Sequence, residues 1–133
     1  MNGVKSIRHN RHAYETVESA LLLPILLLAI MGGFEYALQF HVLHRMTDAA
    51  RDAARCLAVK EGTASQATTL ATNELADLHA TFTVTTVVPP QGAASPDVVV
   101  TITVPRSAIS LGVFGLSTDG VIKASTTMRK EGQ

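Results

Sequence analysis

The sequence has one cysteine, no tryptophan and few other aromatic residues. A single cysteine, Cys56, excludes an intramolecular disulfide, and we interpret it as a small helix residue rather than an intermolecular bridge. With few aromatic side chains, a core outside any membrane must be built from Val, Ile, Leu and Ala. Positive and negative side chains balance to a formal net charge of zero. No basic patch follows the first residues, which argues against nucleic acid as a partner.

Motifs for catalysis and for metal binding are also missing. The sequence contains no G-x-S-x-G, no glycine-rich phosphate loop, no H-E-x-x-H and no C-x-x-C. His41 and His44 are three residues apart, and His9 and His12 form a second pair. We expect the two pairs on opposite sides of a membrane, where they cannot share an ion. The sequence therefore predicts no catalytic residue, no metal site and no cofactor.

A long apolar run is the most informative feature that is present. Residues 19–34 carry no charge and are dominated by Leu, Ile, Met, Ala and Phe. As a helix this run is roughly 24 Å long, and residues up to about 38 extend it toward the ~30 Å hydrocarbon core. Glu18 stands directly before it, where a carboxylate is costly. We interpret Glu35, near its other end, as an interfacial carboxylate with access to water.

The flanking charges predict the orientation of this span. Lys5, Arg8 and Arg11 precede it without an acidic residue before Glu15, whereas the residues beyond it mix both signs. The positive-inside rule then places the N-terminus in the cytoplasm and the rest outside. A secretory signal peptide is the competing interpretation. It fits poorly, because the run is long, no A-x-A site closes it, and a helical pattern continues through its end.

The chain divides into a basic leader (1–13), a long helix (14–59) and an α+β domain (60–133). We expect the helix to cross the membrane at about residues 19–38, with a kink at Pro24 and a soft point at Gly33. Its second half is amphipathic, and small residues such as Ala50 and Ala53 permit close approach of another element. The apolar stripe comprises Leu38, Val42, Met46, Ala49, Ala50, Ala53 and Leu57.

The periodicity then changes from 3.6 to 2. A second helix is expected from Ser65 to about Leu78, followed by alternating strands at 81–88, 97–104 and 121–129. These strands predict a small antiparallel sheet with one face on the helices, and hence an α+β fold. Residues 105–119 are apolar yet lie between strands. They form either a connection folded under the sheet or an exposed patch that docks on a partner or on the membrane surface.

Three motifs together resemble the TadE-like proteins, which are minor pilins (pseudopilins) of bacterial tight-adherence, or Flp-type, pili. They are VESALLLP at residues 17–24, GFEY at 33–36 and DAARDAAR at 48–55. Members carry an apolar N-terminal helix that begins V-E-F-A-L-x-L-P, a G-x-x-E-[FY] near its end and an alanine-rich A-A-R-x-x-A-R stretch. The resemblance is strong over about residues 11–59 and covers the remainder only in outline.

The resemblance implies cleavage by a prepilin peptidase between Ala13 and Tyr14, so that Glu18 becomes the fifth residue of the mature chain. Ala13 stands where the family usually has glycine, and Ser19 stands where Phe or Tyr usually follows the glutamate. In a stack of helices, Glu18 of one subunit would pair with the Tyr14 amine of its neighbour. Pro24, Gly33, Glu35, Ala50 and Ala53 are candidate helix-packing positions.

The implied function is that of a structural, non-enzymatic subunit in assembly of a tight-adherence pilus. Its implied partners are other pilin subunits, the prepilin peptidase, the inner-membrane assembly platform and the membrane itself. The chain would cross the bacterial inner membrane once, with a periplasmic C-terminal domain. The alternative is a membrane-anchored periplasmic binding module that is not incorporated in a pilus. A membrane enzyme is a third hypothesis, for which the sequence offers no site.

Overall fold

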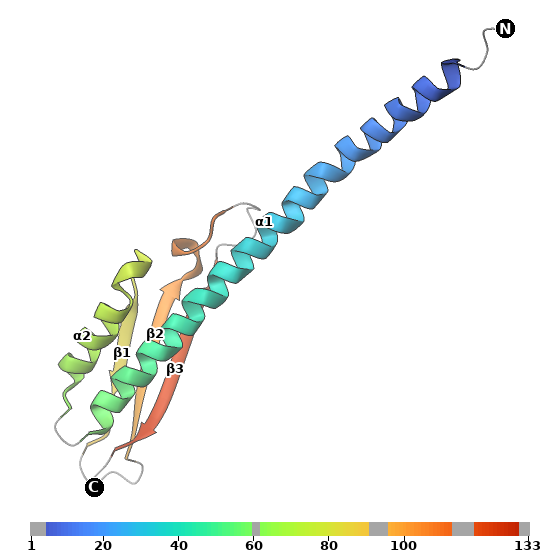
Figure 1. Cartoon of the computed structure of the whole chain (residues 1–133). Helices are drawn as coiled ribbons and strands as arrows, with labels where there is room; N and C mark the ends of the chain where they lie inside the picture. The colour runs from blue at the N-terminus through green and yellow to red at the C-terminus, as the bar shows by residue number, and fades with distance from the viewer. Residues whose placement is uncertain (1–4, 60–61, 91–95, 113–118, 131–133) are drawn as a thin grey trace.

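The fold consists of one very long helix, with a short helix and a three-stranded sheet packed beside its C-terminal half (Figure 1). The computed structural model describes residues 5–59, 62–90, 96–112 and 119–130, with side chains from residue 13 onward. The helices are α1 (Lys5–Ala58) and α2 (Ala64–Glu74), with short 3₁₀ turns η1 (Ala76–Leu78) and η2 (Arg106–Ala108). The strands are β1 (Thr83–Val87), β2 (Asp97–Pro105) and β3 (Val121–Arg129). The predicted α+β fold class is confirmed.

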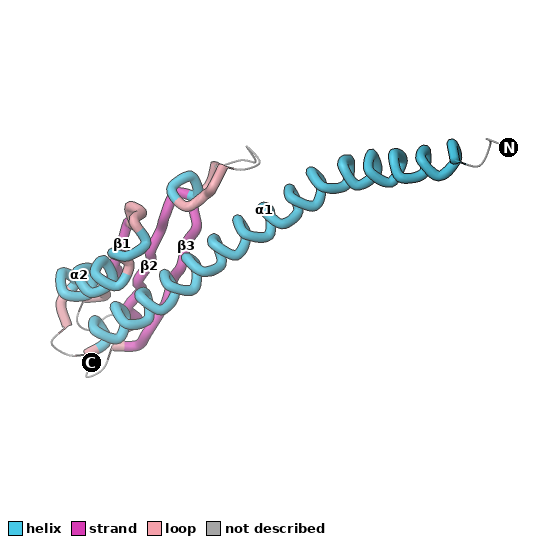
Figure 2. The backbone as a smooth tube through the Cα atoms, turned by 45° about the horizontal axis from the view of Figure 1, so that its top comes forward, coloured by secondary structure: helices cyan, strands magenta, loops and turns pink. Residues whose placement is uncertain are grey.

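Helix α1 is longer at its N-terminal end than the sequence pattern predicts. It begins at Lys5 rather than at about Tyr14, because residues 5–13 contain neither glycine nor proline to stop it. The helix also continues through Pro24, and Figure 2 shows its N-terminal half bending away from the line of the remainder. The half with large apolar side chains therefore projects well beyond the sheet.

The sheet has the order β1-β2-β3 with both pairings antiparallel. Its central strand follows the expected alternation: Val98, Val100, Ile102 and Val104 are buried, and the residues between them are partly exposed. Helix α1 packs on β2 and β3, and α2 packs on β1, so both helices cover the same face of the sheet (Figures 1 and 2). The opposite face is rich in threonine and valine.

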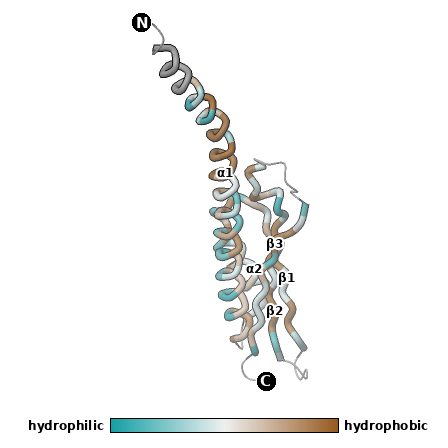
Figure 3. Tube along the Cα trace, turned by 90° about the vertical axis from the view of Figure 1, so that its right-hand side faces the viewer, coloured by the Kyte–Doolittle hydropathy of each residue, from teal (hydrophilic) through white to brown (hydrophobic). Residues whose placement is uncertain are grey.

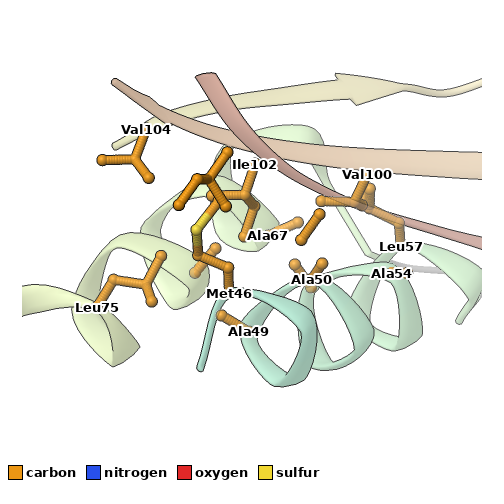
Figure 4. Packing of buried hydrophobic residues seen from close by; sticks show 14 of the residues in the cluster. Met46, Ala49, Ala50, Ala54, Leu57, Ala67, Leu75, Val100, Ile102 and Val104 are labelled. Atoms are coloured by element: carbon orange, nitrogen blue, oxygen red, sulfur yellow. The ribbon is translucent and has the colours of Figure 1, made fainter. Parts of the chain in front are cut away.

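Small side chains of α1 bring it close to the sheet. Ala49, Ala50 and Ala53 are fully buried, and Met46 points from α1 toward Ile102 (Figure 4). The predicted stripe is correct except for Leu38, which is 40% exposed. The buried residues among the described side chains of the two helices are Val42, Met46, Ala49, Ala50, Ala53, Ala54, Leu57, Ala58, Ala67 and Ala71, and Leu75, directly after α2, is buried with them.

The turn between the helices is specified locally. A Cβ at Gly62 would lie 1.7 Å from the Cys56 carbonyl oxygen, so only glycine fits there. Thr63 then begins α2 with a capping box: its hydroxyl accepts from the Gln66 N–H at 3.3 Å, and the Gln66 side chain accepts from the Thr63 N–H at 3.1 Å. This turn places α2 antiparallel to the end of α1 and over β1.

Candidate functional site

The N-terminal half of α1 exposes an apolar surface. Helix α1 is long and apolar enough to cross a membrane, and none of its most apolar stretch is buried by the described residues. Figure 3 shows the hydrophobic colouring concentrated there. A core helix of a soluble protein would be covered instead, so this surface is suited to lipid or to other helices. The exposed large side chains between residues 21 and 34 are Leu21, Leu22, Leu23, Ile25, Leu26, Leu27, Leu28, Ile30, Met31 and Phe34.

The predicted processing and assembly residues lie on this projecting half. Ala13, Tyr14 and Glu18 are all exposed, and Tyr14 is 73% exposed. Tyr14 and Glu18 are one helical turn apart and share a face of α1. The fold brings none of the three against the domain, so their surfaces remain available to a neighbouring molecule.

The candidate helix-packing residues separate into two groups. Pro24 and Gly33 are exposed, and a Cβ at Gly33 would meet nothing within 4 Å. Ala50 and Ala53 are instead fully buried in this chain's own core. The two alanines therefore belong to the core that α1 forms with α2 and the sheet, whereas Pro24 and Gly33 are exposed and accessible to another helix.

Glu35 has a specific partner within the chain. Its carboxylate accepts a hydrogen bond from the hydroxyl of Ser110, 75 positions later in the sequence, and Glu35 is only partly exposed. The Ser110 hydroxyl also accepts from the Gly112 N–H at 3.1 Å. Glu35 is thus more than a solvated interfacial carboxylate, because it ties the connection after β2 to α1 where the uncharged run ends.

No sequence pattern distinguishes Ser110 from the other serines of this largely apolar connection. Next to Ser110, Ile109 is partly buried and packs against the core, whereas Leu111 is 55% exposed. Val113, Phe114 and Leu116 lie outside the described residues. Both interpretations of the 105–119 segment therefore remain open for its central part.

Charged side chains join α1 to the C-terminal end of α2 and to η1. The Arg45 guanidinium donates from α1 to the Glu74 carbonyl oxygen and to Asp77, each at 2.9 Å. Partial burial of Glu74, followed by the negative charge of Asp52 and a hydrogen bond that the protonated Glu74 carboxyl donates to Asp52, raises the pKa of the Glu74 carboxyl. These contacts are mostly exposed and fix the packing of α2 on α1.

No group of three metal-binding side chains occurs among the described side chains. His41 and His44 are exposed on α1, and the side chains of His9 and His12 lie outside the described part. The arrangement offers surfaces for association rather than a set of converging catalytic groups.

Comparison with protein families supports the motif resemblance. Residues 15–55 match the family model described as TadE-like protein, a range that contains all three motifs and most of α1. The resemblance is therefore confirmed for this segment, and the family suggests a part in tight-adherence pilus systems. The α2 helix and the sheet lie outside the match. Comparison with curated proteins and with solved structures gave no significant match.

Proposed function

We propose that this chain is a minor pilin (pseudopilin), a structural and non-enzymatic subunit that takes part in assembly of a tight-adherence, Flp-type pilus. The observation that carries the proposal is the TadE-like segment at residues 15–55, on a helix whose apolar half projects uncovered from a small domain. A subunit of a helical fibre needs such a shape, because its projecting helix packs among the helices of its neighbours.

In this proposal α1 first anchors the chain in the bacterial inner membrane. Lys5, Arg8 and Arg11 hold the N-terminus in the cytoplasm, and the domain lies in the periplasm. A reporter that is active only in the periplasm, fused after Gln133, should therefore be active. Activity of a cytoplasmic reporter alone at that position would contradict both the topology and the pilin function.

The prepilin peptidase would cleave between Ala13 and Tyr14. Mass spectrometry of the membrane form should then find a chain beginning at Tyr14, and Ala13→Gly should be processed at least as well. A chain that keeps Met1 in cells with active peptidase would contradict processing. Such a result would favour an uncleaved, membrane-anchored binding module.

Glu18 has the central part in assembly. Cleavage leaves a positive amine on Tyr14, and the Glu18 carboxylate of an adjacent subunit can pair with it once the two helices stand in the correct register. Pairing offsets the burial of both charges, whereas a subunit in the wrong register leaves them unpaired. The other partners in this proposal are further pilin subunits and the inner-membrane assembly platform.

The decisive experiment separates insertion from assembly. Glu18→Leu removes a costly charge from the membrane edge, so the level of the chain in the membrane should hold or rise. Recovery in sheared surface pili, or pilus formation, should nevertheless fall by at least about tenfold, because an unpaired buried charge costs ~3–5 kcal/mol.

Glu18→Gln should reduce pilus assembly in the same way, although glutamine keeps the shape of the side chain. Glu15→Gln is the matched control, since it makes the same change one turn earlier and should leave assembly close to wild type. Normal assembly of a stably inserted Glu18→Leu chain would disprove the role of Glu18.

A further inference from the structure

A cavity of about 310 Å³ lies where α1 leaves the domain. One wall is a single face of α1 beginning directly after Glu35, formed by Tyr36, Gln39, Phe40 and Leu43. The other wall is formed where β2 ends and β3 begins, and includes Arg106 and Lys123. None of the described residues that line the cavity is acidic, and the Glu35 carboxylate is already engaged by Ser110.

The backbone holds Arg106 firmly in this wall. The Arg106 N–H donates to the Gly120 carbonyl at 3.0 Å, and its own carbonyl accepts from Ser110 at 3.0 Å. The side-chain Nε is buried and has no hydrogen-bond partner among the described residues. A buried donor without an acceptor is unfavourable. Because Arg106 as a whole is partly exposed, an acceptor from outside the chain can reach the terminal nitrogens of its guanidinium rather than Nε. Its guanidinium geometry suits a phosphate oxygen.

The position of the cavity identifies the source of that acceptor. The uncharged run of α1 ends at residue 34, so Tyr36 and Phe40 stand at the level where a bilayer changes from hydrocarbon to headgroups. Both aromatic side chains are more than half exposed, as is typical of aromatic residues at a membrane interface. The cavity is close in volume to the smallest ligand pockets, about 300 Å³, which suits a headgroup rather than a whole lipid. The acyl chains would lie along the exposed apolar surface of α1.

We propose that this cavity binds the headgroup phosphate of an anionic phospholipid from the leaflet on the domain's side of the membrane. Arg106 receives the phosphate, Lys123 adds a second positive charge at the rim, and Tyr36 and Phe40 contact the glycerol region. The inference rests on the membrane anchor of the proposed function. Binding of this kind fixes the height of the domain above the bilayer before the subunit leaves the membrane.

The test uses the full chain in nanodiscs that contain phosphatidylcholine and phosphatidylglycerol. Native mass spectrometry then counts the lipids that stay bound when the discs are dissociated. The wild-type chain should retain phosphatidylglycerol in preference to phosphatidylcholine. Arg106→Gln and Lys123→Gln should each reduce this preference by about fivefold, the effect expected for one cation near an anionic lipid surface. Arg129→Gln, at the opposite end of β3, makes the same change of charge and should have no effect.

Three results would overturn the inference. An inserted wild-type chain could retain both lipids equally, or a double Arg106→Gln/Lys123→Gln variant could retain phosphatidylglycerol as the wild type does. The third is loss of a cross-linked dimer in the double variant with lipid retention unchanged, which would assign the cavity to an acidic group of a second copy. Failure of the wild-type chain to enter nanodiscs would instead remove the anchor on which both proposals stand. Lys123 is exposed, so its variant keeps the test valid if Arg106→Gln unfolds.

Discussion

The two halves of α1 have the same backbone conformation and opposite surroundings. In the N-terminal half, large Leu and Ile side chains are exposed on every face, whereas the C-terminal half buries a stripe rich in alanine. None of the described residues covers the most apolar stretch of the first half, so this stretch is suited to lipid or to the surface of another molecule. The second half is covered by β2, β3 and α2.

The difference in side-chain size has a physical reason in each half. Large side chains maximise the apolar area that leaves water on insertion, about 25 cal/mol per Å². Small side chains allow the backbone of α1 to approach the sheet closely, and the gain there comes from dense packing. One helix therefore carries two kinds of interface, and substitutions of the same type should have different effects in each.

The largest contrast should come from shortening methionine. Met46 is fully buried and Met31 is 43% exposed, both on α1. Met46→Ala should leave a cavity between α1 and β2 and reduce the free energy of unfolding by ~2–5 kcal/mol, whereas Met31→Ala should leave it nearly unchanged. Amide hydrogen exchange of β2, measured on the full chain in detergent micelles, gives the free energy of unfolding of each variant. An equal loss of this free energy in Met46→Ala and Met31→Ala would show that the two halves of α1 are not independent.

Enlarging alanine tests the same contrast from the opposite direction. Ala53 is fully buried in the core of the domain, while Ala37 is exposed. Ala53→Leu should overpack this core and destabilise the domain by ~1–3 kcal/mol. Ala37→Leu should leave the stability of the domain unchanged, and its extra apolar area should support membrane insertion. Thermal unfolding followed by the β-sheet circular dichroism signal measures the first effect, and membrane fractionation measures the second. A stable Ala53→Leu domain would mean that this core accommodates a larger side chain.

Much of the fold could be predicted because its signals are local. The change from a 3.6-residue period to a 2-residue period separated the helices from the strands, and β3 has the predicted bounds, Val121–Arg129. The prediction for Leu38 was wrong, because an amphipathic stripe does not indicate where the element covering it ends. The start of α1 at Lys5 was also missed, since a polar sequence without a helix breaker has no clear boundary.

The contacts at the end of the domain from which α1 projects could not be predicted from the sequence. Glu35 and Ser110 are 75 positions apart, and no repeat or spacing connects them. Arg106 looked like an ordinary loop cation until the fold placed it opposite Tyr36 and Phe40. The roles of Ala13, Tyr14 and Glu18 involve other molecules, so neither local sequence pattern nor the packing of one chain addresses them, and they remain proposals.

The contact between Glu35 and Ser110 marks the boundary between the two halves, and removing it should have an intermediate effect. Ser110→Ala and Glu35→Ala should each cost about 1 kcal/mol, since one hydrogen bond is lost at a partly exposed site. The loss should appear as faster amide exchange of Ile109 and Leu111 while the β2 amides are unaffected.

A double-mutant cycle isolates the contact from other effects of each change. The two losses should not add in the double variant, because the same hydrogen bond is absent in both single variants. Ser107→Ala, at an exposed serine of the same connection, is the control and should change nothing. Strict additivity would mean that the two side chains do not interact in solution.

The smallest effect should come from Glu74, within the covered half. Partial burial and the nearby Asp52 raise the pKa of the Glu74 carboxyl above its ordinary value of 4.5. A carboxyl with a raised pKa in the folded state is held more easily in its protonated form. Its contribution to stability is therefore complete below about pH 4.5 and is lost as the pH rises through the folded-state value. Glu74→Gln imitates the protonated form, so at pH 7 it should raise the melting temperature slightly, by about 1–2 °C for a partly exposed group.

Melting curves of the full chain in detergent at pH 7 and at pH 4 test this prediction. The gain from Glu74→Gln should be present at pH 7 and absent at pH 4, where the wild-type carboxyl is itself largely protonated. Asp52→Asn removes the neighbouring negative charge that raises the pKa of Glu74. In that background Glu74→Gln should gain less at pH 7, because only burial and the weaker repulsion from Asp48 still disfavour the ionised carboxyl. A gain of the same size at both pH values would mean that the substitution acts through packing, and that the charge of Glu74 has no part in how α2 is held on α1.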